Sequence, residues 1–129
     1  MVAKETVKFG NFMEQAYGFS QAVKVGDTIH VAGQTAFGDD GIVGVGDMAA
    51  QMREAYAAIG RVLAGFGATH ADIVDETLYV TDPMAAAMAS IEVRGEVYGP
   101  DFEVASSLIG VQALGAPELM IEIKCTARL

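Results

Sequence analysis

The stretch that decides the fold runs from Ala105 to Ala127 and reads ASSLIGVQALGAPELMIEIKCTA. It contains two apolar, β-branched runs that are separated by the four residues Gly115 to Glu118. Glycine and proline interrupt regular structure, whereas Val and Ile suit a pleated surface. The pattern therefore predicts two antiparallel strands that are joined by a short turn as a β-hairpin.

The second of these runs carries an acid in an unusual setting. Side chains alternate along a strand, so Glu122 shares a face with Lys124 and has an isoleucine on either side in the sequence. Its carboxylate is then paired with Lys124, desolvated with a raised pKa, or turned toward a wet cavity. We favour a cavity carboxylate that handles a water molecule over a solvated Glu122–Lys124 ion pair.

Upstream of this stretch, strand patterns alternate with two helix patterns. Period-2 alternation predicts strands at residues 6–9, 19–25, 28–34 and 73–80, and a Gly-Asp turn joins the second to the third. Apolar residues at three- and four-residue steps predict helices at residues 47–66 and 83–98, the latter with its apolar face on Met84, Met88, Ile91 and Tyr98. Asp47 and Asp82 are the expected N-caps. The element order is βββ-α-β-α-ββ.

This order predicts an α+β fold in which both helices cover one face of a mixed β-sheet, because both crossover connections are right-handed. The other face then has no cover within the chain. In the strand at 28–34, alternation places His30, Ala32 and Gln34 on that uncovered face. Since these residues and Tyr79 are only moderately polar, we expect another subunit to cover the face and pockets to form between chains.

Length and composition limit the possible partners. The 129 residues predict one domain, 1–129, and 52% of them are hydrophobic, which favours a subunit interface. The net charge is −9 without a basic cluster, so neither nucleic acid nor an anionic membrane is an expected partner. The single cysteine, Cys125, and the lack of a leader or a long apolar run indicate a soluble, cytoplasmic protein.

Several motifs are too weak to predict a cofactor or a metal. The run Gly44 to Ala49 fits the dinucleotide pattern Gly-x-Gly-x-x-Ala, but Asp47 would place a negative charge where a pyrophosphate binds. His30 and His70 lack metal-ligand spacing, and Asp39-Asp40 lacks the other ligands of a calcium loop. We therefore expect no cofactor and no metal; His30 is either a hydrogen-bonded structural residue or part of an intersubunit pocket.

Dispersed motifs resemble the RidA/YjgF family over nearly the whole chain, from about Ala16 onward. They are Phe19-Ser20-Gln21-Ala22, Val31-Ala32-Gly33-Gln34, Ala49-Ala50-Gln51, Thr77 to Asp82, and Ile121-Glu122-Ile123 with Ala127. The resemblance implies a chorismate-mutase-like fold and a homotrimer with three clefts between subunits. It also implies hydrolysis of reactive enamines and imines, such as 2-aminoacrylate, to a keto acid and ammonia.

Carried over by motif, the resemblance assigns the glutamate that orients water to Glu122, the backbone donor to Gly33 and the aromatic wall to Phe19. The family's carboxylate-gripping arginine is missing, because its position falls on Ser106, with Ser107 next. Serine hydroxyls cannot replace two charge-assisted hydrogen bonds, each worth roughly 1.5 to 3 kcal/mol, so a carboxylate-bearing substrate is disfavoured. Arg94, on the second helix, either replaces this arginine or is a solvated helix residue; we favour the second.

The leading hypothesis is therefore an imine or enamine deaminase, a hydrolase for a small imine, enamine or carbonyl metabolite. Catalysis is assigned to Glu122 and Ser106, and substrate binding to Phe19, Gly33 and Ser107. The alternative is a non-catalytic trimer of the same fold that binds or senses a small molecule. Ribonuclease activity, an older label of the family, is not expected because the chain has no Lys/Arg cluster and no histidine pair.

Overall fold

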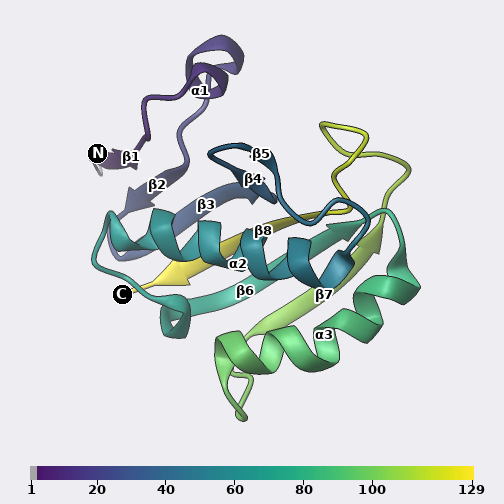
Figure 1. Ribbon diagram of the computed structural model, residues 1–129. Coiled ribbons are helices and arrows are strands. Elements are labelled where there is room, and N and C mark those ends of the chain that lie inside the picture. The colour runs from purple at the N-terminus through teal and green to yellow at the C-terminus, as the bar shows by residue number, and fades with distance from the viewer. Residues whose placement is uncertain (1–2) are drawn as a thin grey trace.

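The computed structural model describes residues 3–129. One sheet contains β1 (Lys4–Val7), β2 (Ala22–Val25), β3 (Thr28–Gln34), β6 (Ile73–Val80), β7 (Ala105–Gly110) and β8 (Ile121–Arg128). A separate two-stranded ribbon contains β4 (Phe37–Gly38) and β5 (Gly41–Ile42). The helices are α1 (Phe12–Tyr17), α2 (Met48–Ala64) and α3 (Pro83–Tyr98), with a 3-10 turn, η1 (His70–Asp72), before β6 (Figure 1).

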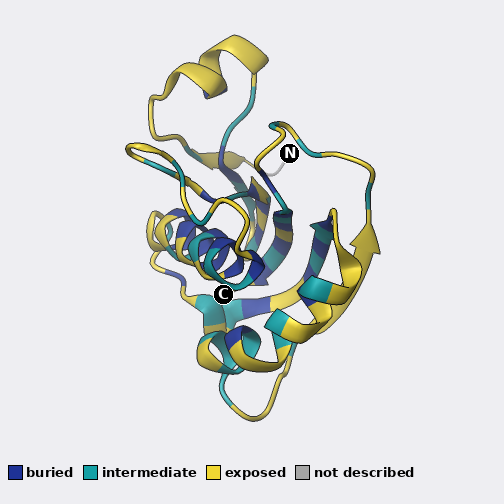
Figure 2. Ribbon diagram, turned by 45° about the vertical axis from the view of Figure 1, so that its right-hand side comes forward, coloured by how far each residue is buried: buried dark blue, intermediate teal, exposed yellow. Residues whose placement is uncertain are grey.

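The six-stranded sheet has the order β1-β2-β3-β8-β6-β7, in which only β6 and β7 are parallel neighbours. The helices α2 and α3 lie on the same face of this sheet, as the two crossovers predicted (Figures 1 and 2). Buried side chains of α2, including Met52, Ile59 and Leu63, form the core with Ile121 and Ile123 of β8. The predicted mixed sheet with two helices on one face is therefore confirmed.

The predicted hairpin over Ala105–Ala127 is wrong, although both of its strands exist. β7 pairs in parallel with β6, and β8 crosses to the middle of the sheet, where it pairs antiparallel with both β3 and β6. Ten residues, 111–120, connect the two strands and cross the end of β6. Gly115 and Pro117 lie in this long connection. Glycine and proline occur in long loops as well as in tight turns, so the local pattern cannot distinguish the two.

A β-bulge in β3 changes which side chains face the helices. The register steps from Val31 opposite Cys125 to Gln34 opposite Ile123, so β3 has two residues where β8 has one. Because a bulge reverses the alternation beyond it, Gln34 joins Val31 on the buried side. The prediction that Gln34 lies on the uncovered face is therefore wrong, and Gly33 lies at the bulge instead.

The second predicted helix exists, but its packing differs from the prediction. Met84, Met88 and Ile91 are 74%, 64% and 77% exposed, while the small residue Ala86 and Val93 face the core. An alanine-rich helix offers small side chains on several faces, so the three- and four-residue spacing of its larger residues does not identify the buried face. The N-caps Asp47 of α2 and Asp82 of α3 are confirmed, since each side chain accepts a hydrogen bond from the helix backbone.

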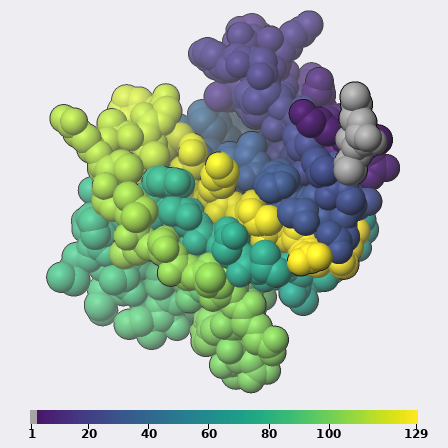
Figure 3. Space-filling model, turned by 180° about the vertical axis from the view of Figure 1, so that it is seen from behind, coloured from purple at the N-terminus to yellow at the C-terminus, as the bar shows by residue number. Residues whose placement is uncertain are grey.

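The uncovered face is visible from behind, where β3, β8, β6 and β7 lie side by side at the surface (Figure 3). Edge strand β7 is exposed along its whole length, with Leu108 and Ile109 41% and 44% exposed. At one end of the sheet, the segment between β1 and β2 extends from the body and contains α1 (Figures 1 and 2). The helix α1 was not predicted from the sequence.

Candidate functional site

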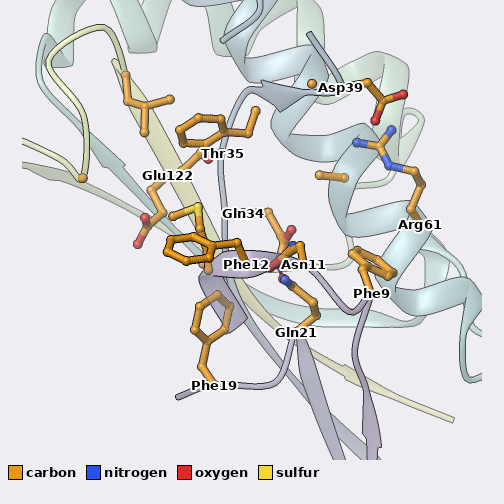
Figure 4. A pocket seen from close by; sticks show the side chains of 17 residues that line it. Phe9, Asn11, Phe12, Phe19, Gln21, Gln34, Thr35, Asp39, Arg61 and Glu122 are labelled. Carbon is orange, nitrogen blue, oxygen red and sulfur yellow. Dashed lines mark hydrogen bonds between the residues drawn. The ribbon is translucent and has the colours of Figure 1, made fainter. Parts of the chain in front are cut away.

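A cavity of about 830 Å³ opens where β3 and β8 meet the segment around α1. Three of the predicted site residues line it: Phe19 from the chain before β2, Gly33 from the bulge, and Glu122 from β8 (Figure 4). Other lining residues come from α1, the β4–β5 ribbon, α2 and the β7–β8 connection. The sequence motifs on distant segments therefore meet in one cavity.

Glu122 is held in this cavity by the sheet on both sides of its strand. It pairs with Tyr79 of β6, and an ideal Cβ built on Gly33 would lie 2.4 Å from its Oε2 atom. Because Gly33 has no side chain, the carboxylate of Glu122 can occupy this space. Burial raises the pKa of Glu122 above its ordinary value.

Lys124 does not neutralise this acid. Within residues 3–129, no basic side chain lies within ion-pair distance of the Glu122 carboxylate. Lys124 is exposed and does not line the cavity. Glu122 itself is among the residues that line the cavity. A half-buried carboxylate with a raised pKa and access to a cavity can accept a proton from water near neutral pH.

The segment around α1, which forms one wall of the cavity, is fixed by a buried carboxylate. Glu14 accepts hydrogen bonds from the backbone N–H groups of Phe9, Gly10 and Asn11, at 2.8, 2.8 and 3.2 Å. The Asn11 side chain accepts from Glu14 N in return, which completes a capping box. The backbone hydrogen bond from Phe9, followed by other donors, lowers the pKa of Glu14.

A chain of amide side chains connects this acid to the bulged strand. Gln21 Nε2 donates to Glu14 Oε2 at 2.9 Å, and Gln34 Nε2 donates to Gln21 Oε1 at 2.9 Å. Gln34 Nε2 also donates to the carbonyl oxygen of Ala32 in the bulge. All three side chains are buried, so the wall carrying the aromatic residues and the strand carrying Gly33 are bonded to each other.

Ser106 lies on the wrong face of the sheet for the role predicted for it. Its Oγ donates to Glu76 Oε2 at 2.6 Å, on the side that faces the helices. The same carboxylate accepts from Tyr56 Oη and Tyr98 Oη, both at 2.7 Å, and from Arg94 Nε at 2.8 Å. Because β7 is in register with β6, Ser106 has the same orientation as Glu76 and cannot share a cleft with Glu122.

Arg94 lies on the helix-covered face of the sheet, which differs from both positions considered for it, the solvent and the cleft. It forms an ion pair with Glu76, whose side chain is completely buried, and its guanidinium stacks over Tyr98 and Phe102, 5.3 and 5.4 Å from the ring centroids. This interaction holds Arg94 on the helix-covered face. We call Glu76 and its four partners, Tyr56, Arg94, Tyr98 and Ser106, the Glu76 cluster. This cluster connects α2, α3, β6 and β7 and serves as a buried structural network.

Two other predicted residues lie outside the cavity. Ser107 points to the uncovered face and is exposed, and His30 is exposed on β3 opposite Thr126. Neither lines the cavity within a single chain. Both would need a second subunit on this face to contribute to a shared cleft.

Several residues that line the cavity were not predicted from the sequence. Phe9 lies before α1, Phe12 is the first residue of α1, and Phe37 lies in the β4–β5 ribbon; all three expose aromatic surface at the cavity rim. The pattern Asn11-x-x-Glu14 followed by Gly18 is a capping box and a left-handed C-cap, and it could have predicted α1. Arg61 of α2 gave no signal beyond that of an exposed helix residue.

Among residues 3–129, no group of three or more His, Cys, Asp or Glu side chains is arranged to hold a metal ion. In the same part of the chain, no helix combines the length and the apolar character that crossing a membrane requires.

Comparison with known proteins identifies the family. The family model described as Endoribonuclease L-PSP matches residues 10–129. The solved structure of Rv2704 from Mycobacterium tuberculosis, a member of the YjgF/YER057c/UK114 family, is 36% identical with a TM-score of 0.85. That match covers 98% of this chain and 100% of the other. The chain belongs to the YjgF/Rid family.

Two curated relatives agree with this membership. The RutC family protein YjgH from Escherichia coli is 31% identical over 111 residues, which cover 86% of this chain and 82% of YjgH. The uncharacterized protein SCO2049 from Streptomyces coelicolor is 38% identical over 65 residues, or 50% of this chain, and the match spans about half of that relative, 48%. The predicted RidA-like fold of this YjgF/Rid protein is thereby confirmed.

Proposed function

We propose that this YjgF/Rid protein is an imine or enamine deaminase that hydrolyses a small imine, enamine or carbonyl metabolite. The observation that carries the proposal is Glu122, a half-buried carboxylate without an ion-pair partner in the described chain, which lines a cavity together with Gly33 and Phe19. A base with a raised pKa is suited to activating water near neutral pH. The family includes enamine and imine deaminases, which supports this reaction type.

In the proposed reaction, Glu122 accepts a proton from water as the oxygen attacks the carbon of the C=N bond. The backbone N–H of Gly33 donates a hydrogen bond to the substrate, which suits its place in a bulge, where ladder pairing is interrupted. The ring of Phe19 forms an apolar wall beside the acid. Removal of a general base lowers a rate by about 10²- to 10⁴-fold, so Glu122→Gln should reduce turnover by at least about 10²-fold.

The active assembly is a homotrimer in which the uncovered sheet face is shared between subunits. The exposed apolar side chains Leu108 and Ile109 of β7 favour burial against a second copy. In that assembly Ser107 and His30 could reach a cleft that they do not reach within one chain. Sedimentation should then give a mass of about 40 kDa, three times the 13.5 kDa of one chain.

The test is ammonia release from 2-iminopropanoate and from uncharged imines, measured above the spontaneous rate. Wild type should accelerate release from at least one of these imines, and Glu122→Gln should not. Glu118→Gln removes an exposed acid that does not line the cavity and serves as the matched control. Equal rates for wild type and Glu122→Gln would rule out the role assigned to this acid.

A non-catalytic, ligand-binding trimer is the second candidate, and one observation favours it. The position that carries the family's arginine holds Ser106, which is bonded to Glu76 on the far side of the sheet. Calorimetry with a metabolite panel would support this candidate if it found Glu122-dependent binding without turnover of any imine. Ribonuclease activity is not proposed, and we expect no RNA cleavage by the repurified protein at physiological salt.

A further inference from the structure

The charges around the cavity are distributed unevenly. Glu122 lies at one end, whereas Arg61 lies at the opposite end beside Asp39 (Figure 4). Among the described residues, Arg61 is the one basic side chain in the lining, and it forms an ion pair with Glu54 at 3.1 Å. Within residues 3–129 of one chain, the end of the cavity that carries Glu122 is therefore negative and has no basic side chain in its lining.

Aromatic rings surround the same space. Phe9, Phe12 and Phe37 are 52%, 79% and 43% exposed, and Phe19 is partly buried, so all four retain accessible ring surface. In Figure 4, Phe12 and Phe19 lie on the side of the cavity nearer to Glu122. The face of an aromatic ring attracts cations, and clustered rings recognise ammonium-type ligands. The acid and the rings thus favour the same kind of ligand.

We infer that the substrate is an iminium cation that lacks a carboxylate and carries an apolar or aromatic side chain. This inference rests on the proposed function and specifies its substrate. A protonated C=N group is attracted by Glu122 and by the ring faces, whereas the carboxylate of an imino acid would meet Glu122 with no cation at that end. The cavity, at about 830 Å³, also has room for a ring-sized side chain.

The hydrolysis balances without an oxidant or a cofactor. Glu122 takes a proton from water, the oxygen bonds to the iminium carbon, and the C=N π electrons move to nitrogen, which gives a neutral carbinolamine. The proton on Glu122 then passes to nitrogen, the carboxylate removes the hydroxyl proton, and the C–N bond breaks with its electrons on nitrogen. Ammonia takes that proton from Glu122, so iminium and water become a carbonyl compound and ammonium.

The chemistry of this substrate also indicates the reaction that supplies it. A carboxylate-free iminium forms when a primary amine loses two hydrogens to an oxidase or a dehydrogenase. Oxidation of an α-amino acid gives an imine that retains the carboxylate. The inferred place of this protein is therefore immediately after amine oxidation, and its product is an aldehyde or a ketone.

Binding by the wild-type protein tests the ligand class without relying on catalysis. Calorimetry compares phenethylammonium with 3-phenylpropanoate, which have the same ring and spacer but opposite charge. We expect at least about tenfold tighter binding of the cation, and we expect Glu122→Gln to remove the preference while Glu118→Gln retains it. Equal or tighter binding of the carboxylate by wild type would overturn the inference.

Turnover separates this inference from the proposed function. An amine oxidase generates the imine of phenethylamine and an amino acid oxidase generates that of phenylalanine, and these imines differ only in the carboxylate. We expect the first to be hydrolysed with at least about tenfold higher kcat/KM. Faster, Glu122-dependent hydrolysis of the second would overturn the substrate class and leave the deaminase proposal standing. Cation-selective binding without hydrolysis of either imine would instead overturn the deaminase proposal.

Discussion

Replacing Gly33 with alanine should inactivate the protein without unfolding it. A Cβ at this position would lie 2.4 Å from Glu122 Oε2, 2.6 Å from its Cδ and 2.8 Å from its Cγ. An ordinary contact of this kind is about 3.4 Å or longer, so the carboxylate oxygen has to move by roughly 1 Å. The atoms displaced belong to the flexible end of one side chain, and the backbone of Gly33 does not have the positive φ that favours glycine.

The expected magnitudes differ strongly between stability and activity. Where the backbone conformation is allowed for alanine, replacing glycine with alanine stabilises a protein by about 0.4 to 1 kcal/mol, because it lowers the conformational entropy of the unfolded chain. An off-rotamer Glu122 costs about 0.5 to 1.5 kcal/mol. The free energy of unfolding should therefore change by about 1 kcal/mol or less. A displacement of about 1 Å at a reacting group lowers kcat by about 10²-fold.

The assay combines thermal unfolding with imine hydrolysis by wild type, Gly33→Ala and the control Gly95→Ala. A Cβ at Gly95 of α3 meets no atom within 4 Å, so this variant should keep its activity and gain up to about 1 kcal/mol. Wild-type activity in Gly33→Ala would refute the proposed position of Glu122. A fall in Tm of more than about 10 °C would refute the reasoning that a flexible side chain absorbs the contact.

Four other predictions follow from the buried groups and the two sheet faces. Because burial raises the pKa of Glu122 above 4.5, Glu122→Gln should be more stable than wild type at pH 7, and this gain in Tm should be absent below pH 4.5 and grow as the pH rises from 4.5 to the folded pKa. Glu76→Leu leaves Arg94 unpaired and should cost about 3 to 5 kcal/mol in urea unfolding; a loss below 1 kcal/mol would contradict a structural role. On the uncovered face, Ile109→Arg should give monomers by sedimentation, whereas Met88→Arg, on the exposed side of α3, should not. Desolvation raises the pKa of Cys125 to about 12, so native protein should resist thiol reagents that label it after unfolding, and rapid native labelling would contradict its burial.

Local sequence patterns predict single helices and strands better than they predict which strands pair with one another. The spacing of apolar residues in α2 and the N-caps Asp47 and Asp82 are local features, and the structure contains them as predicted. Pairing of β8 with β3 joins residues as far apart in the sequence as Thr28 and Arg128, and its pairing with β6 joins residues as far apart as Ile73 and Ala127, so no local pattern predicts it. For this reason the two strands of the Ala105–Ala127 stretch are predicted correctly, whereas their pairing as a hairpin is predicted wrongly.

The candidate site was predicted in part for the same reason. Glu122, Gly33 and Phe19 were placed by motif, and all three line the cavity. Ser106 was misplaced because counting along a strand identifies a position but not its face when the strand's partner and register are unknown. Pairing of Ser106 with Glu76 in β6 decides that face.

The bulge and the helix α1 are too short to be predicted from the sequence pattern. One extra residue in β3 is enough to reverse the orientation of Gln34, and the sequence around it contains no clear marker besides Gly33. The helix α1 has six residues and depends on the hydrogen bonds of Glu14, so a periodicity analysis cannot detect it. The aromatic rim was therefore the least predictable part of the cavity.

The placement of Glu122 on a strand that is hydrogen-bonded on both edges has a consequence for how the protein adapts. Its amide should be among the slowest to exchange with deuterium, since exposing it requires separation of β8 from β3 and β6. The segment around α1 lies outside these strand pairings and is held instead by the hydrogen bonds of Glu14. We therefore expect ligand preference to be changed most readily by substitutions in the aromatic rim, while the acid keeps its position in the sheet.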